Sequence, residues 1–288
     1  MGVEGLFKSL SACVAKTVDL RNFPSGKLVI VDGHFVAHRL ATRNIADSLV
    51  ERGDSLPLAN AFVKRMYRFR EIGLKVKVVF DGAAPPAKER TNSARSFRRK
   101  EALRRREEAR KKGERSQNAN GCVSINQDVV TVILKALQDN DFYAMVAPYE
   151  ADAQVILLEA ELGAVFVYAN DADLLVMGVK NLISEIDFRR GPAYLTGKLF
   201  NETAVERLEM VAALSGCDWC KFPSIGSATA IKRVWQDGAN VDKQATAVSL
   251  LSSPRVPPLQ AKHSIQTAIT MFRHSIAFSI RTQITVHL

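Results

Sequence analysis

The 288-residue chain has few cysteines and no long hydrophobic run. Its four cysteines are scattered, and the lone Cys217-x-x-Cys220 pair has no second Cys or His pair nearby. We therefore expect neither a zinc site nor a disulfide framework, which points to a reducing intracellular compartment. Because no stretch of about 18 apolar residues occurs, we expect no membrane-spanning helix.

The N-terminus also lacks targeting features. The opening MGVEGLFKSLSACVAK has an apolar stretch that is too short for a signal peptide. Leu6 stands where a myristoylation signal has Ser or Thr. No internal repeat is evident along the chain.

Positive charge is in excess. The sequence has 40 Lys and Arg against 30 Asp and Glu, a formal net charge of +10 at pH 7, and its 47% of apolar residues supports a packed core. This excess suggests a polyanionic partner, with simple solubility as the alternative. The clustering of the charge between residues 83 and 120 favours nucleic acid.

That basic segment differs in kind from the rest of the chain. It is dense in Lys and Arg from Lys88 to Arg115 and has almost no large apolar side chains beyond Phe97 and Leu103. Such a segment cannot bury itself, although its composition favours a helix. A disordered loop, a nuclear-localisation signal and a mobile arm that closes on phosphates are compatible interpretations. We expect partial disorder without DNA and order with it.

Three continuous apolar runs of strand length occur, at Lys27–Val31, Val76–Phe80 and Val165–Tyr168. Runs without alternation are typical of strands that are buried on both faces, as in parallel sheets. A helix is predicted between the first two, from Leu58 to Ile72, because apolar residues recur there at helical spacing. The alternation of strand and helix predicts an α/β fold with a central, mostly parallel sheet flanked by helices.

Acidic residues follow each of these strands. Asp32 and Asp81 come directly after the first two, and Asp171 and Asp173 lie just beyond the third, while Glu150 and Asp152 precede a helix-like run. Ligands of open α/β sheets bind at the carboxyl ends of the strands. Carboxylates that converge there need a compensating cation, and hard divalent ions take oxygen ligands. The alternative is that the DAD sequence is a turn and Glu150 caps a helix.

The second half of the chain reads mainly as helices. The predicted elements are a helix at Ile125–Leu137, short strands within Gly178–Phe200, a helix from Asn201 to Leu214, a two-helix hairpin at Ser215–Ile231, a last helix near Lys262–His274 and an extended tail. Backbone N–H groups at the start of the second hairpin helix can hold a phosphate. A plain connection between helices is the alternative for this turn.

Taken together, these motifs resemble the structure-specific 5′ nuclease family, which includes flap endonuclease and exonuclease 1. The matching stretches are MGVEGL, Asp32 after its strand, VFDG, PYEADAQ, NDADLL, and LSGCDW followed by SIGSATA. They occur in the family's order and cover nearly the whole chain. PYEADAQ and the FRHSIAF stretch are more similar to exonuclease 1 than to flap endonuclease.

The resemblance implies roles for particular residues. The metal ligands would be Asp32, Asp81, Glu150, Asp152, Asp171, Asp173 and Asp218, binding two Mg²⁺ ions for which Mn²⁺ can substitute. Lys88 and Arg95 would face the scissile phosphate. The DNA-binding positions would be Gly2, His34, His38, Arg98, Arg99, Ser224, Ile225, Gly226 and Ser227.

The resemblance also implies a domain organisation. The chain would be a single 5′ nuclease domain of residues 1–288, with an N-terminal nuclease region (1–95), a basic arch insert (83–120), an internal region (125–235) holding a helix-two-turn-helix hairpin at about 215–231, and C-terminal helices and tail (236–288). The hairpin departs from the family pattern because Ser224 replaces its usual first glycine, which weakens the expectation of a K⁺ ion there.

The activity implied is a Mg²⁺-dependent 5′→3′ double-stranded DNA exonuclease with 5′ flap endonuclease activity, acting in the nucleus on duplex DNA with a 5′ end, flap, nick or gap. We expect a monomer. No binding motif for a mismatch-repair or sliding-clamp partner is evident. A flap- or bubble-specific endonuclease, a 5′ exoribonuclease and an inactive DNA-binding scaffold remain as alternatives.

Overall fold

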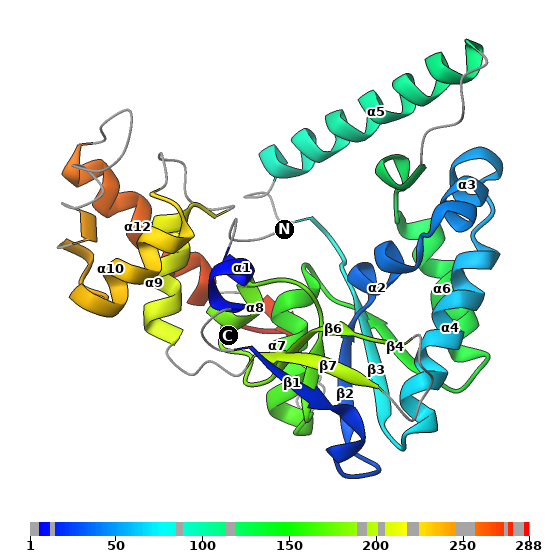
Figure 1. The fold of residues 1–288 in the computed structure, drawn as a ribbon, viewed down its shortest axis with the longest axis horizontal. Coiled ribbons are helices and arrows are strands. Elements are labelled where there is room, and N and C mark those ends of the chain that lie inside the picture. Colours follow the sequence, from blue (N-terminus) through cyan, green and yellow to red (C-terminus); the bar gives the residue numbers. More distant parts are fainter. Residues whose placement is uncertain are drawn as a thin grey trace.

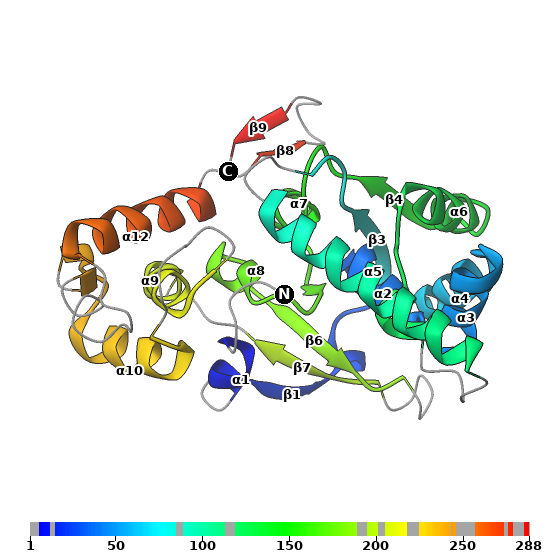
Figure 2. The same cartoon turned by 90° about the horizontal axis from the view of Figure 1, so that it is seen from above.

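The computed structural model of the chain (Figure 1) describes residues 6–11, 15–84, 89–112, 119–188, 195–200, 205–217, 225–242, 244–245, 257–273, 276–278 and 285–287. A seven-stranded sheet lies at its centre, with helices on both faces (Figures 1 and 2). The basic helix α5 (Glu89–Lys111) stands apart from these layers.

The sheet has the strand order β1-β7-β6-β5-β2-β3-β4. Its strands are β1 (Lys16–Asp19), β2 (Leu28–Asp32), β3 (Lys75–Phe80), β4 (Tyr143–Val146), β5 (Phe166–Tyr168), β6 (Leu182–Ile186) and β7 (Thr196–Phe200). The five strands from β6 to β4 pair in parallel, whereas β7 and β1 are antiparallel to their neighbours. The predicted fold class is therefore confirmed.

Strand β2 shows why its sequence is apolar without alternation. Val29, Ile30 and Val31 are all fully buried. Val29 and Val31 belong to the core that contains Phe62 of α4 (Leu56–Glu71), whereas Ile30 belongs to the core on the opposite face. Successive side chains of a strand point to opposite faces, so a strand covered on both sides needs apolar residues throughout.

Two groups of helices cover the sheet. One core is built with α2 (Gly33–Leu40), α4 (Leu56–Glu71) and α6 (Gln127–Gln138), next to α3 (Arg43–Arg52). The other is built with α1 (Leu6–Ser11), α7 (Ala151–Leu162), α8 (Asp173–Val176), α9 (Val205–Ser215), α10 (Ser227–Asp237) and α12 (Pro258–Arg273).

Four smaller elements also occur among the described residues. The 3-10 turns are η1 (Leu20–Asn22) and η3 (Ala119–Cys122), and η3 packs between α3 and α5. Strands β8 (Ile276–Phe278) and β9 (Thr285–His287) form a separate antiparallel pair, and β8 lies against α7. In its described residues the tail is therefore extended, as predicted.

Most predicted elements agree with the structure to within two to four residues. The helices predicted at 58–72 and 125–137 are α4 and α6, and the last predicted helix is α12. Asn201, the predicted cap of α9, lies outside the described residues. Neither α3 nor β4 was predicted. β4 is a short edge strand with partly exposed side chains, so it lacks the apolar run that marks the central strands.

Candidate metal centre and nucleic-acid surface

Three aspartates meet at the carboxyl edge of the sheet. Asp32 ends β2, Asp81 directly follows β3, and Asp171 lies three residues after β5. These strands are neighbours in the order β5-β2-β3, and all three are parallel. Parallel topology therefore brings together carboxylates that are up to 139 positions apart in the sequence.

The Asp32 carboxyl is influenced by both of the other acids. Burial, and then repulsion from Asp81 and Asp171, raise the pKa of Asp32 to about 7, although the N–H groups of Phe35 and His34 partly offset this rise. The Asp32 carboxylate accepts the Phe35 N–H at 3.0 Å and so caps α2. A raised carboxyl pKa beside two other acids indicates negative charge that a bound cation would stabilise.

Asp81 joins this edge to the start of α7. Its Oδ1 accepts the N–H of Ala151 at 2.8 Å, and so takes the capping role that the side chain of Glu150 leaves open. The chain after β3 approaches the main chain of Ala147 so closely that residue 82 must be glycine. A Cβ atom at Gly82 would lie 1.9 Å from the carbonyl oxygen of Ala147. Glu150 is therefore the N-cap residue by position, as the alternative interpretation proposed, but its carboxylate makes no capping hydrogen bond.

Asp171 and Asp173 form the turn that the DAD sequence suggested. Asp171 Oδ1 accepts the N–H of Asp173 at 3.1 Å, and Asp173 begins α8 with 4% of its surface exposed. The turn also places both residues at the carboxyl edge beyond β5. The two interpretations of this motif, turn and acidic site, are compatible.

The donor set fits Mg²⁺. Every predicted ligand is a carboxylate, and hard divalent cations prefer oxygen. Within the described residues no group of three or more His, Cys, Asp or Glu side chains is close enough to enclose a metal ion. Asp218 lies outside the described residues.

The two predicted histidines of α2 lie in different environments. His34 Nδ1 is 3.1 Å from the backbone N of Asp81, whose N–H it accepts, and 3.2 Å from Asp81 Oδ2. Its ring also meets Phe80 edge-on at 5.6 Å. His34 therefore supports Asp81, a contact that its predicted role in DNA binding did not include. His38 is exposed, one helical turn further on.

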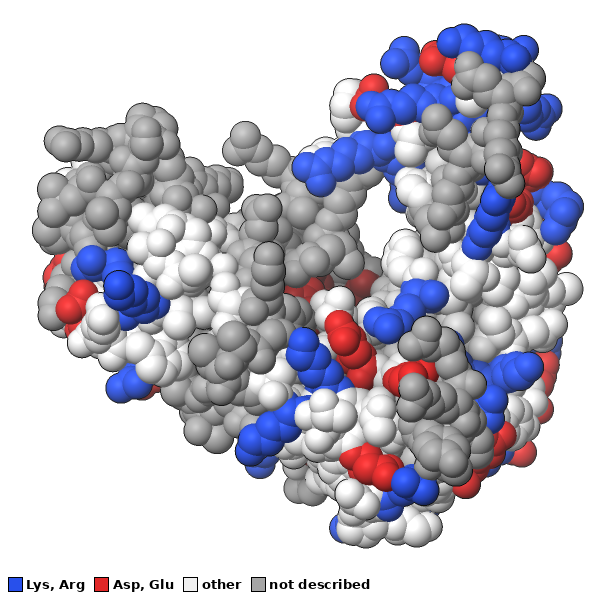
Figure 3. Space-filling model, in the orientation of Figure 1, with Lys and Arg blue, Asp and Glu red and all other residues white. Residues whose placement is uncertain are grey.

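Helix α5 carries the basic insert. Figure 3 shows Lys and Arg gathered over α5, with acidic side chains visible in the hollow beneath it. Arg98 is exposed, whereas Arg99 donates to Ser124 Oγ at 3.0 Å. Lys88 and the side chain of Arg95 lie outside the described residues, as do Gly2 and Ser224, so their predicted roles stay predictions.

The predicted hairpin is described on both sides of its turn. Helices α9 and α10 pack together, and the N–H of Ile225 is bonded to the carbonyl of Leu214 at 3.2 Å. Gly226, with φ of 76°, occupies the left-handed region that favours glycine and precedes α10. Ser227 Oγ lies 2.9 Å from Ser9 Oγ of α1. These contacts anchor the hairpin to the N-terminal helix.

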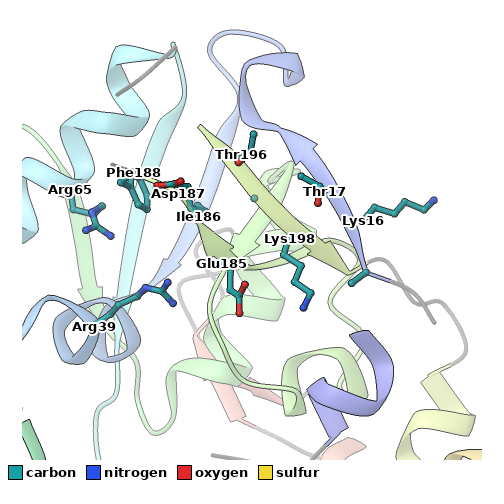
Figure 4. Close-up of a pocket in the computed structure, with 12 residues that line it drawn as sticks. Lys16, Thr17, Arg39, Arg65, Glu185, Ile186, Asp187, Phe188, Thr196 and Lys198 are labelled. Atoms are coloured by element: carbon teal, nitrogen blue, oxygen red, sulfur yellow. The ribbon is translucent and has the colours of Figure 1, made fainter. Parts of the chain in front are cut away.

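A hollow of about 790 Å³ at the carboxyl end of β6 was not predicted from the sequence. Four basic side chains line it together with two acids: Lys16, Arg39, Arg65, Lys198, Glu185 and Asp187. Figure 4 shows Glu185 of β6 near Lys198 of β7, with Arg39 of α2 to their left in the same hollow. These cations are scattered in the sequence, so no local motif could have indicated this site.

Arg65 is a partly buried cation of this hollow. Its guanidinium lies 4.0 Å from the centroid of the Phe188 ring, and burial lowers the pKa of Arg65. A guanidinium that stacks on an aromatic ring still presents N–H groups along its edge to a planar or phosphate partner. Because β6 pairs with β5 in parallel, this mainly basic hollow lies at the same edge of the sheet as Asp171.

The sequence matches two domain families: the XPG N-terminal domain over residues 1–102 and the XPG I-region over residues 141–218. The chain belongs to the XPG family. The predicted membership of a structure-specific nuclease family is thus confirmed.

Curated relatives agree with this assignment. Exodeoxyribonuclease 1 of Schizosaccharomyces pombe is 28% identical, with 100% of this chain and 52% of that protein aligned. Exodeoxyribonuclease 1 of Saccharomyces cerevisiae is 31% identical over 81% of this chain and 35% of its own length. The chain therefore spans about half or less of the length of these relatives.

Solved structures share the fold. The Holliday junction-resolving enzyme GEN1 in complex with product DNA and Mg²⁺ has a TM-score of 0.63 at 15% identity, covering 98% of this chain and 66% of that one. The catalytic core of Rad2 in complex with DNA substrate has a TM-score of 0.58 at 17% identity, covering 82% and 69%. Among the helices that the structure describes, none is long and apolar enough to cross a membrane.

Proposed function

We propose that the chain is a Mg²⁺-dependent 5′→3′ double-stranded DNA exonuclease that also cuts 5′ flaps. One observation carries this proposal: aspartates from three neighbouring parallel strands crowd together beneath a basic helix. An acidic edge suits divalent metal, and a basic cover suits a phosphate backbone. The family and its exodeoxyribonuclease relatives support this choice.

Seven carboxylates would share the metal binding: Asp32, Asp81, Glu150, Asp152, Asp171, Asp173 and Asp218. When bound, two Mg²⁺ ions would supply an activated water and stabilise the leaving oxygen of the phosphodiester. Mn²⁺ is expected to substitute. The XPG-fold structure of GEN1 was solved with Mg²⁺ and Mn²⁺, which supports divalent metal use.

The side chains of this chain would bind and orient the DNA. Lys88 and Arg95 would offset the charge that grows on the scissile phosphate. The hairpin from Ser224 to Ser227 would hold a phosphate away from the cut by contacts that do not read bases, with K⁺ as the candidate bridging ion. The basic hollow with Lys16 and Lys198 would add backbone contacts beside the acidic edge.

His34 would act on the metal site indirectly. Its Nδ1 accepts the backbone N–H of Asp81, and this hydrogen bond helps to hold the main chain that carries the Asp81 carboxylate. Such outer contacts are typical of metal sites, where they hold ligands in one geometry. We place the activity in nuclear DNA repair, replication or recombination, because the relatives are eukaryotic exonucleases.

A comparison of substrates tests the proposal. Purified protein is assayed on recessed-end duplex DNA, on a 5′ flap and on single-stranded RNA, each with Mg²⁺ and with EDTA. We expect Mg²⁺-dependent cleavage of the two DNA substrates. Cleavage of RNA alone would indicate an exoribonuclease, and DNA binding without any cleavage would indicate an inactive scaffold.

A further inference from the structure

The basic helix α5 is attached to the body of the protein near its C-terminal half. Arg99 reaches Ser124, and Ala109 is 5% exposed where the helix packs on η3. Residues 99, 102, 106 and 109 recur at three- and four-residue spacing, so they form one stripe along the helix. Figures 1 and 2 show the N-terminal half of α5 extending from this attachment across the middle of the molecule.

Arg106 is the central contact of this stripe. It is 8% exposed, and its Nη2 lies 2.8 Å from Asp47 Oδ1 and 2.6 Å from Glu51 Oε1. Asp47 and Glu51 are one turn apart on α3, so one guanidinium bridges two carboxylates of a different helix. The hydrogen bond to Glu51 contributes most to the raised pKa of Arg106. We call these three residues the Arg106 clamp.

The neighbouring arginines behave differently. The side chains of Arg104 and Arg105 are 68% and 64% exposed, and their ion pairs are with Glu101 and Glu108 of the same helix. Exposed pairs within one helix contribute little to stability and do not fix the position of that helix. Arg104 and Arg105 therefore contribute positive charge alone, whereas Arg106 contributes positive charge and also links α5 to α3.

A change of angle at the Arg106 clamp would displace the N-terminal half of α5. Position 95, which the family resemblance assigns to the scissile phosphate, is eleven residues from Arg106, or about 16 Å along the helix. A tilt of about 10° at the clamp would move that position by roughly 3 Å. Misplacement of a catalytic group by about 1 Å can lower a rate a hundredfold.

We propose that the Arg106 clamp is a positioning element for cleavage, which holds α5 at the angle that sets residues 95–99 above the acidic edge. The proposal rests on the nuclease function proposed above. It assigns to Asp47 and Glu51, which lie on α3 and outside every predicted site, a role in the reaction rate. Arg106 acts through the position of α5 and not through contact with the reacting atoms.

The test compares Arg106→Met with Arg105→Met, which removes the same charge one residue away. Single-turnover cleavage of a recessed-end duplex at saturating enzyme should fall at least tenfold for Arg106→Met and less than twofold for Arg105→Met. The dissociation constant for DNA should change less than threefold in both. A double variant, Asp47→Asn with Glu51→Gln, should reproduce the loss of rate, and adding Arg106→Met should not lower the rate further.

Hydrogen exchange supplies a measurement that is independent of activity. Amides of residues 93–104 should exchange faster in Arg106→Met than in Arg105→Met, while the amides of β2 and β3 stay protected in both. Equal cleavage rates and equal amide exchange in the two variants would overturn the proposal. Loss of amide protection throughout the sheet in Arg106→Met would also overturn it. If the wild-type protein cuts no DNA, the proposed function fails, and the exchange experiment still decides whether the clamp positions α5.

Discussion

Asp81 serves the fold and the candidate site with different atoms. Its Oδ1 accepts the first N–H of α7, while its Oδ2 lies 3.2 Å from His34 and its charge raises the pKa of Asp32. A residue that caps one helix and contacts another cannot move freely. The carboxylate is therefore held in place before any cation or DNA arrives, which is the condition for a preorganised site.

Asp173→Asn should abolish most cleavage without loss of DNA binding. Asn keeps the size and much of the hydrogen bonding of this 4%-exposed residue but removes the negative charge that a cation needs. We expect the single-turnover rate in Mg²⁺ to fall by at least about a hundredfold and the dissociation constant for duplex DNA to stay within about threefold. Asp139→Asn, an exposed partner of Lys135 on the body, is the control. A near-normal rate would remove Asp173 from the metal ligands.

Glu159 gives a prediction about stability and pH. It is 6% exposed, and burial raises its pKa above the ordinary 4.5, although it accepts the N–H groups of Lys180 and Asn181. Above pH 4.5 the unfolded chain releases this proton before the folded chain does. The free energy of unfolding should therefore fall as pH rises from 4.5 towards the raised pKa.

Glu159→Gln should remove that part of the pH dependence. Urea unfolding at several values between pH 4.5 and 7.5 should show the variant gaining stability relative to wild type as pH rises. Glu161→Gln, on the same helix, is the control and should follow the wild-type curve. Parallel curves for wild type and Glu159→Gln would show that the burial of Glu159 does not disfavour its charge.

At the scale of elements, the connection after β3 decides the geometry of the acidic edge. The N–H of Gly82 meets the carbonyl of Tyr149, and the N–H of Ala83 meets that of Pro148. These bonds tie the end of β3 to the segment that enters α7. The distance between the Asp81 and Glu150 backbones is thereby set by main-chain contacts and not by the carboxylates themselves.

Gly82→Ala should disrupt this connection. Its Cβ would lie 1.9 Å from the Ala147 carbonyl oxygen, so the backbone must shift. We expect a loss of about 1–3 kcal/mol in the free energy of unfolding, and slower cleavage because the acidic edge is displaced. Gly121→Ala is the control, since its Cβ would meet the Ala102 Cβ at an ordinary 3.8 Å. Equal stability of the two variants in urea would show that β3 and α7 tolerate separation.

At the scale of the whole molecule, charge is unevenly distributed around the sheet edge. Aspartates lie at that edge, whereas Lys and Arg outnumber the acids on α5 and in the lining of the basic hollow. The net charge of +10 therefore favours binding of a polyanion to the surface around a centre that suits a metal cation. Binding of DNA to such a surface should depend steeply on salt.

Lys16→Ala combined with Lys198→Ala should reduce that dependence. If both lysines neutralise phosphates, the slope of log affinity against log salt should become shallower by up to about 1.8, since each contact contributes about 0.9. Lys135→Ala, whose lysine pairs with Asp139 on α6, should leave the slope unchanged. Fluorescence anisotropy with a recessed-end duplex between 50 and 200 mM salt measures it. An unchanged slope would place the DNA away from the hollow.

The sequence alone determined the three central strands β2, β3 and β5, the acids that follow them and the helical character of the basic insert. Each of these features is local in the sequence. A continuous apolar run indicates a strand that is covered on both faces, and an Asp that follows the run can be read directly from the sequence. Ala, Glu, Arg and Lys favour helix wherever they occur. The family motifs added the order of these pieces. Motif position was therefore enough to name the metal ligands and the phosphate-facing cations as candidates.

Only the tertiary structure decided which groups meet. The capping of α7 by Asp81, the bridge from Arg106 to Asp47 and Glu51, and the hollow beside β6 join residues that are tens of positions apart or more. Their partners are chosen by strand order and by the packing of helices on the sheet, and periodicity within one segment carries no information about either. The position of α5 over the acidic edge is likewise a property of the folded chain.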